Sequence, residues 1–138
     1  MPTLLLVPHA LPHQECASPN EQVELHPTSQ QAALCAESRA QGIAAEAYSP
    51  LGQGADLNVA AVTALAQKRG ATPAQIVLGW HLGVHNIVIP KTTHPHRMRE
   101  NLAAAGITLT ADELGAVTAL DSGARIGADP AEASVSQM

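Results

Sequence analysis

Residues 22–48 read QVELHPTSQQAALCAESRAQGIAAEAY, and this stretch establishes the fold class. Residues 23–25 form a short strand candidate that a His-Pro pair ends, and residues 43–48 form a second strand candidate. Between them, residues 30–41 have the length of a helix, carry small apolar side chains, and end at Gly42, a typical C-cap residue. A strand, a helix and a strand at this spacing predict a βαβ unit with parallel strands.

Helix signals continue toward the C-terminus. Asp56 follows a turn-rich segment and is placed to cap a helix. Thr72 and Gln75 form a capping box with proline at the first helical position, which predicts a further helix. A helix that opens at Pro95 and another that Thr110 caps are predicted beyond it.

Residues 87–89, Ile-Val-Ile, form the third strand candidate, and Pro90 ends it. Such a run is typical of a parallel strand that is buried on both faces. Three strands that alternate with helices predict an α/β fold. A closed (β/α)8 barrel takes about 250 residues, so 138 residues form either a very small open domain or a piece of something larger.

The composition limits the classes of partner. Seven Lys and Arg against 12 Asp and Glu give a formal net charge of −5, which offers no basic footprint for nucleic acid or an anionic membrane. The apolar run at residues 4–7 is too short for a signal sequence or a membrane span. Two distant cysteines exclude a disulfide scaffold and are compatible with a reducing, cytoplasmic location.

The chain divides into two parts. Residues 1–19 hold four prolines and no apolar period beyond residue 7, which predicts an irregular N-terminal tail. Residues 20–138 hold the α/β pattern and close with a short, loop-like C-terminal tail that begins near Ser122.

Five motifs in residues 20–130 occur in the order and spacing of the aldo/keto reductase family. They are Gln22-Val-Glu-Leu-His-Pro27, Ala47-Tyr-Ser-Pro-Leu-Gly52, Thr72-Pro-Ala-Gln75 leading into Trp80-His81, Ile89-Pro-Lys91, and Arg97-x-x-Glu100-Asn101. The C-terminal tail, Arg125-x-Gly127-x-Asp129-Pro130, most resembles that of bacterial reductases of the 2,5-didehydrogluconate reductase type. The resemblance implies a partial (β/α)8 TIM barrel of about the last three βα units, open rather than closed.

The resemblance also implies an oxidoreductase that uses NADPH to reduce a carbonyl to an alcohol. By resemblance, Gln22 holds the nicotinamide carboxamide and Tyr48 stacks on the nicotinamide ring. The other implied contacts are Ser49, Leu51 and Gln53 at the pyrophosphate, Lys91, Thr92 and Arg97 at the adenosine 2′-phosphate, and Glu100 and Asn101 at the adenine. The ammonium of Lys91, the guanidinium of Arg97 and the amides at the start of the helix near Pro95 are groups that suit a dianionic phosphate.

The family's catalytic Asp, Tyr, Lys and His lie on earlier strands and match nothing in this sequence. Tyr48, the only tyrosine, matches the stacking position instead. The resemblance therefore predicts a truncated, cofactor-binding portion without catalytic residues, which would meet a small carbonyl substrate only if the missing half of the barrel were supplied. Gly79 stands where an arginine is usual, and Glu24 and His26 are expected to line or pack the sheet rather than catalyse.

Two alternatives compete with this interpretation. The first is a non-catalytic α/β fragment that acts through self-association of exposed strand edges or through a partner chain. The second is a metal site at His81 and His85 or at His94 and His96. Because no Glu follows His81 in the metalloprotease pattern, a metal site is not predicted.

Overall fold

The computed structural model describes residues 19–130 and 132, so the predicted tail at residues 1–19 lies outside it except for Pro19. The elements are β1 (Asn20–Glu24), α1 (Ala32–Ala40), β2 (Ala44–Tyr48), the 3₁₀ segment η1 (Gly52–Asn58), α2 (Ala60–Arg69), α3 (Pro73–Gly83), β3 (Ile87–Val88), α4 (Pro95–Ala103), the 3₁₀ segment η2 (Ala104–Gly106) and α5 (Ala111–Thr118).

The described strands form one parallel sheet in the order β1-β2-β3. Glu24 pairs with Tyr48 across the first two strands, and Ala47 pairs with Val88 across the last two. The α/β prediction and its parallel pairing are therefore confirmed.

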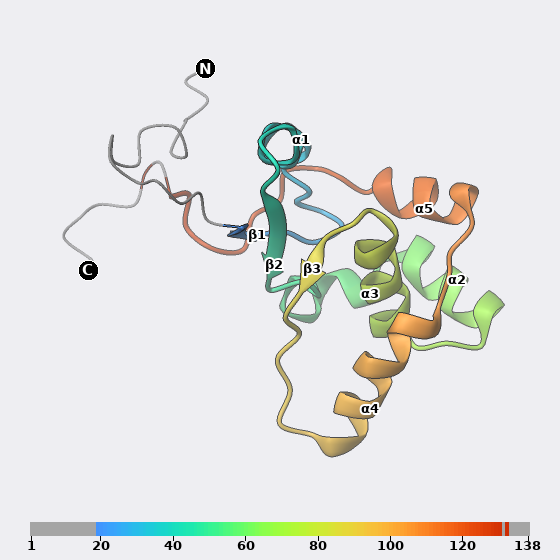
Figure 1. Cartoon of the computed structure of the whole chain (residues 1–138). Coiled ribbons are helices and arrows are strands. Elements are labelled where there is room, and N and C mark those ends of the chain that lie inside the picture. The colour runs from blue at the N-terminus through green and yellow to red at the C-terminus, as the bar shows by residue number, and fades with distance from the viewer. Residues whose placement is uncertain (1–18, 131, 133–138) are drawn as a thin grey trace.

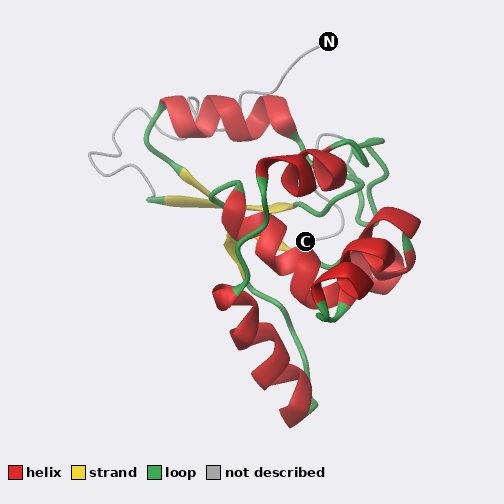
Figure 2. Cartoon of the chain, turned by 90° about the vertical axis from the view of Figure 1, so that its right-hand side faces the viewer, coloured by secondary structure: helices red, strands yellow, loops and turns green. Residues whose placement is uncertain are grey.

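The core lies between the sheet and the helices. Helices α2, α3 and α5 gather on one side of the sheet, and α4 projects away from them (Figures 1 and 2). Buried side chains of α3 meet those of β1, β2, α2 and α5 in one cluster, whose members include Leu25, Ala47, Val62, Ala66, Ile76, Val77, Trp80 and Val117. Alternation along the strands leaves Gln22, Glu24, Glu46 and Tyr48 on the opposite face.

Both predicted capping boxes are present. Thr72 accepts a hydrogen bond from the Gln75 amide while the Gln75 side chain accepts one from the Thr72 amide, and Thr110 and Glu113 form the same reciprocal pair. Each box satisfies two amides that a helix start leaves free, which explains why α3 and α5 begin where the sequence predicts.

The prediction that Asp56 caps a helix is wrong. Residues 52–58 form η1 instead, and α2 begins only at Ala60 after Val59, which has no side-chain cap. Asp56 is buried, and its carboxylate faces His26 and Thr28. A buried partner outside the helix outweighs the local capping preference.

The prediction that the third strand is buried on both faces is also wrong. Ile87 is 43% exposed and Ile89 is 44% exposed, because Ile87 pairs with Glu46 on the sheet face that the described helices leave uncovered. The neighbouring α4 has no buried residue, and its Leu102 is 79% exposed. This edge presents apolar side chains that an all-parallel sheet normally covers.

No helix in residues 19–130 is long and apolar enough to cross a membrane. Within the same range, no group of three His, Cys, Asp or Glu side chains could hold a metal ion.

Candidate functional site

Most residues implied in cofactor binding lie at or just after the carboxyl ends of the strands. Because the strands are parallel, these ends meet at one edge of the sheet. Tyr48 ends β2 there, and the turn at residues 49–54 follows it directly. The loop that carries Lys91 and Thr92 leaves the adjacent strand β3 at the same edge. Ligand sites of parallel α/β folds lie at this position.

Gln22 and Tyr48 share the sheet face that points away from the helices. Gln22 pairs in register with Glu46, one pleat from the pair of Glu24 and Tyr48. Its Nε2 atom donates to Glu46 Oε1 at 2.6 Å, and Asn20 Nδ2 donates to Glu46 Oε2 at 2.5 Å. The sequence analysis missed Glu46, which binds the amide implied to hold the nicotinamide carboxamide; its alternation with Tyr48 along β2 was the available signal.

The turn after β2 is held in a compact, partly left-handed shape. Ser49, Gln53, Gly52 and Gly54 all have positive φ, at 49°, 51°, 58° and 96°. The amide of Gly52 donates to Ser49 O and that of Gly54 to Leu51 O, both at 2.9 Å. These two bonds hold the turn in a defined shape. The structure brings all three residues implied at the pyrophosphate, Ser49, Leu51 and Gln53, into this turn.

His81 of α3 supports the turn through a hydrogen bond to its backbone. Its ring is fully buried, and Nε2 lies 2.9 Å from the carbonyl oxygen of Pro50. Burial lowers the pKa of His81 to about 4, so the neutral ring donates from Nε2 and accepts at Nδ1 from Asn86 Nδ2 at 3.2 Å. A residue that the sequence analysis weighed as a metal ligand is a hydrogen-bonding support of the turn.

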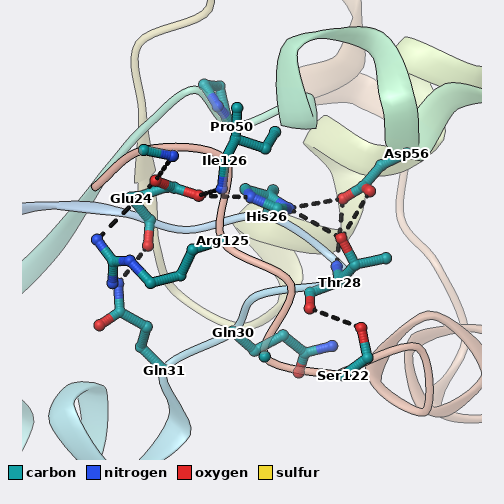
Figure 3. A network of polar contacts seen from close by, with 12 residues as sticks. Glu24, His26, Thr28, Gln30, Gln31, Pro50, Asp56, Ser122, Arg125 and Ile126 are labelled. Atoms are coloured by element: carbon teal, nitrogen blue, oxygen red, sulfur yellow. Dashed lines mark hydrogen bonds and ion pairs between the residues drawn. The ribbon is translucent and has the colours of Figure 1, made fainter. Parts of the chain in front are cut away.

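A buried ionic network links the end of β1 to η1, the segment that overlaps the turn (Figure 3). His26 Nε2 lies 3.0 Å from Glu24 Oε1, and His26 Nδ1 lies 3.0 Å from Asp56 Oδ2. Thr28 donates to Asp56 through its hydroxyl at 2.8 Å and its amide at 3.2 Å. Glu24 and His26 were expected to line or pack the sheet, and in the structure they take part in an ionic network.

The environment of the network favours its charged state. Burial alone would lower the pKa of His26, but its hydrogen bonds to Asp56 and Glu24 outweigh burial and raise the pKa. Burial would raise the pKa of Asp56, yet bonds from His26 and Thr28 lower it. These shifts favour an imidazolium between two carboxylates.

Part of the predicted C-terminal tail is tied to the network. The amides of Ile126 and Gly127 donate to the two carboxylate oxygens of Glu24 at 2.6 and 2.7 Å, and the Arg125 guanidinium lies 3.9 Å from Glu24 Oε2. Burial alone would raise the pKa of Glu24, but these contacts and His26 lower it. The tail is loop-like, as predicted, and it lies against the carboxyl end of β1.

Lys91 lies in the loop four residues before α4, and Arg97 lies in the first turn of α4. Both side chains are exposed, and among the described residues neither has an ion-pair or hydrogen-bond partner. The hydroxyl of Thr92 accepts from the His94 amide at 3.2 Å, and no side chain caps α4. Two free cations near an uncapped helix N-terminus form an environment that favours a phosphate group.

Glu100 and Asn101 lie two turns or less further along α4 and are half-buried. The Glu100 carbonyl accepts a hydrogen bond from Gln75 Nε2 at 3.1 Å, which ties α4 to the start of α3. The structure therefore brings the implied residues together in three groups, one on β1 and β2, one in the turn and one around α4.

A model of the aldo/keto reductase family matches residues 11–122 of the chain. An aldo-keto reductase of Mycolicibacterium vanbaalenii is 45% identical over 109 residues, which are 79% of this chain and 39% of that protein. Methylglyoxal reductase DkgA of Salmonella typhimurium is 45% identical over 111 residues, or 79% of this chain and 40% of that protein. The chain spans about two-fifths of the length of these curated relatives.

Solved structures give the same result. A mutant of Gox0644 in complex with NADPH superposes with a TM-score of 0.84 and 39% identity, covering 88% of this chain and 45% of that chain. The aldo/keto reductase of Brucella melitensis gives 0.68 and 41% identity, covering 72% and 38%.

The fold is thus part of a (β/α)8 barrel, about three βα units with an open sheet. The chain belongs to the aldo/keto reductase family, a family of oxidoreductases.

Proposed function

We propose that this chain is the NADPH-binding portion of an aldo/keto reductase. The observation that carries the proposal is that two unpartnered cations, Lys91 in the loop before α4 and Arg97 in its first turn, flank a helix start that no side chain caps. Such a pair suits the phosphate that distinguishes NADPH from NADH. The NADPH complex of the Gox0644 mutant, which superposes over most of this chain, supports the same cofactor.

The remaining contacts follow the implied assignments. Tyr48 stacks on the nicotinamide ring, and Gln22 exchanges its bond to Glu46 for one to the carboxamide. Ser49, Leu51 and Gln53 border the pyrophosphate, Thr92 joins the two cations, and Glu100 and Asn101 border the adenine.

No residue of this chain is assigned a catalytic role. Carbonyl reduction in the family needs a general acid, and Tyr48 occupies the stacking position. We therefore expect nucleotide binding without useful turnover by this chain alone, and reduction of a small carbonyl when the rest of a barrel is supplied. The expected compartment is the cytoplasm.

Arg97→Ala is expected to lower the affinity for NADPH by about 10- to 150-fold, the loss of a hydrogen bond to a charged group worth about 1.5–3 kcal/mol. Affinity for NADH should stay nearly unchanged, because NADH lacks the 2′-phosphate. Isothermal titration of both nucleotides measures the difference. Arg99→Ala, which removes an exposed guanidinium from the same helix, is the matched control. Equal losses for both nucleotides would contradict the assignment of Arg97.

A second candidate function is a non-catalytic module that self-associates or pairs with a partner chain. The exposed apolar edge favours it, since Ile87 and Ile89 are more than 40% exposed, and Val88 and Pro90 line a groove of about 370 Å³ between α3 and α4. Unpaired strand edges with apolar side chains pair readily with other chains.

Ile87→Lys tests the second candidate. If copies pair through β3, light scattering should give about twice the chain mass of 14.2 kDa for the natural sequence and a single chain mass for the variant. Ile126→Lys changes a side chain of similar exposure away from β3 and should leave the mass unchanged. A monomer at every concentration of the natural sequence excludes self-association through this edge.

A further inference from the structure

We infer that Glu24, His26 and Asp56 are positioning residues that couple the shape of the turn at residues 49–54 to the attachment of residues 125–127. The inference rests on the proposed function, because that function gives the turn its role in binding pyrophosphate. None of the three residues is among the cofactor contacts that the family resemblance implies, although Glu24 and His26 lie within the first motif.

The network is saturated with hydrogen bonds. The exposed fractions of Glu24, His26 and Asp56 are 1%, 0% and 1%, so water does not compete for these groups. Each ring nitrogen of His26 faces a carboxylate oxygen at 3.0 Å, so both nitrogens donate. Thr28 supplies two further donors to Asp56. A group that shifts would leave a buried charge without its partner, which fixes the arrangement.

One end of the network determines the shape of the turn. The Asp56 carboxylate lies directly over Gly52, where a Cβ atom would stand 2.9 Å from Asp56 Cγ. Gly52 is also in the left-handed region, with φ at 58°. The carboxylate therefore packs on the backbone of the turn, and any displacement of Asp56 moves the surface that the turn presents to a phosphate.

The other end of the network holds the C-terminal segment. Both Glu24 oxygens accept backbone amides, from Ile126 and Gly127. Glu24 is in register with Tyr48, and a Cβ atom on Gly127 would lie 3.9 Å from the Tyr48 hydroxyl. The segment thus lies beside the proposed nicotinamide end, while Asp56 lies beside the proposed pyrophosphate end.

The charges themselves argue for positioning rather than stability alone. Desolvation makes a buried ion pair no more stabilising than apolar side chains of similar volume. What the ions add is a set of directed bonds that admits one geometry. Here those bonds join three segments, namely the end of β1, η1 and residues 125–127.

Asp56→Asn tests the inference on the full chain. The amide keeps the volume of the carboxylate but removes the negative charge that faces His26, and its NH2 group replaces the oxygen that accepts from the Thr28 hydroxyl. We expect the dissociation constant for NADPH to rise at least ~10-fold. We also expect faster hydrogen exchange at the amides of Gly52 and Gly54 and at those of Ile126 and Gly127, because both segments share the network.

Glu113→Gln is the matched control. Glu113 is also a buried carboxylate, paired with Lys68 and Arg69, but it lies on α5 away from the turn. Its loss should lower stability and leave the NADPH affinity and the two amide pairs unchanged. Equal effects of the two substitutions on NADPH affinity would reduce the network to a purely structural role and overturn the inference.

Two further outcomes are decisive. If the unaltered chain binds no NADPH, the proposed function fails. If Asp56→Asn speeds hydrogen exchange only at Gly52 and Gly54, the proposed function stands but the coupling is overturned. If Asp56→Asn does not fold, Thr28→Val removes one bond to Asp56 at constant shape and is measured in the same way. Acceleration at both segments supports the coupling, and acceleration at one segment contradicts it.

Discussion

Replacing Trp80 with alanine is expected to lower the free energy of unfolding by about 3–5 kcal/mol. Trp80 is 2% exposed and is the largest side chain of the core. Its indole Nε1 donates to Thr118 Oγ1 at 3.0 Å, and its ring meets His81 edge-on at a centroid distance of 4.7 Å. The surrounding core consists mainly of small aliphatic side chains, so no large neighbour can fill the cavity. A loss of this size is a large fraction of the stability of a small domain.

Urea unfolding followed by circular dichroism measures the loss for Trp80→Ala. Trp80→Phe keeps most of the ring and should cost less, mainly the hydrogen bond to Thr118, about 0.5–1.5 kcal/mol. Leu82→Ala alters an exposed residue of the same helix and should change little. A loss below about 1 kcal/mol for Trp80→Ala would contradict the placement of α3 at the centre of the core.

The second large effect is a loss of stability at acid pH that His81 causes. Its pKa is lowered to about 4 in the folded chain, whereas in the unfolded chain it returns to about 6.5. Between these values only the unfolded chain binds the proton, so stability falls as the pH falls from about 6.5 to about 4. The full difference corresponds to about 3 kcal/mol.

His81→Gln isolates this contribution, because the amide can still donate to Pro50 O but does not titrate. Urea unfolding at about pH 7 and about pH 4.5 should show a smaller acid loss for the variant than for the natural sequence. His26 acts with the opposite sign, since its raised pKa stabilises the fold below about 6.5 and the stabilisation is lost as the pH rises through its folded pKa. If both chains lose the same free energy of unfolding at acid pH, the pKa of His81 is not lowered in the folded state.

The parts of the fold that depend on local patterns could be predicted from the sequence. The capping boxes at Thr72 and Thr110 define helix starts through contacts within four residues, so α3 and α5 begin as predicted. The parallel pairing of β1 and β2 followed from the helix between them.

Features that depend on distant partners could not be predicted in this way. Asp56 has the residue type of a helix cap, and only the folded chain brings His26 and Thr28 to its carboxylate. The apolar sequence of β3 resembles that of a central strand, but strand order makes it an edge.

The same distinction between local patterns and distant partners applies to the candidate site. The motifs identified Tyr48, Lys91 and Arg97 as cofactor contacts, which remains a prediction. Their sequence could not show that Glu46 binds Gln22, or that Glu24 holds the amides of residues 126 and 127 from more than a hundred positions away.

Calorimetric titration of the 138-residue chain with NADPH, and in parallel with NADH, tests the central claim most directly. The account predicts saturable, one-to-one binding of NADPH, with NADH at least ~10-fold weaker because it lacks the phosphate that Lys91 and Arg97 are placed to bind. Absence of binding by a chain that circular dichroism shows to be folded, or equal affinity for the two nucleotides, would contradict it.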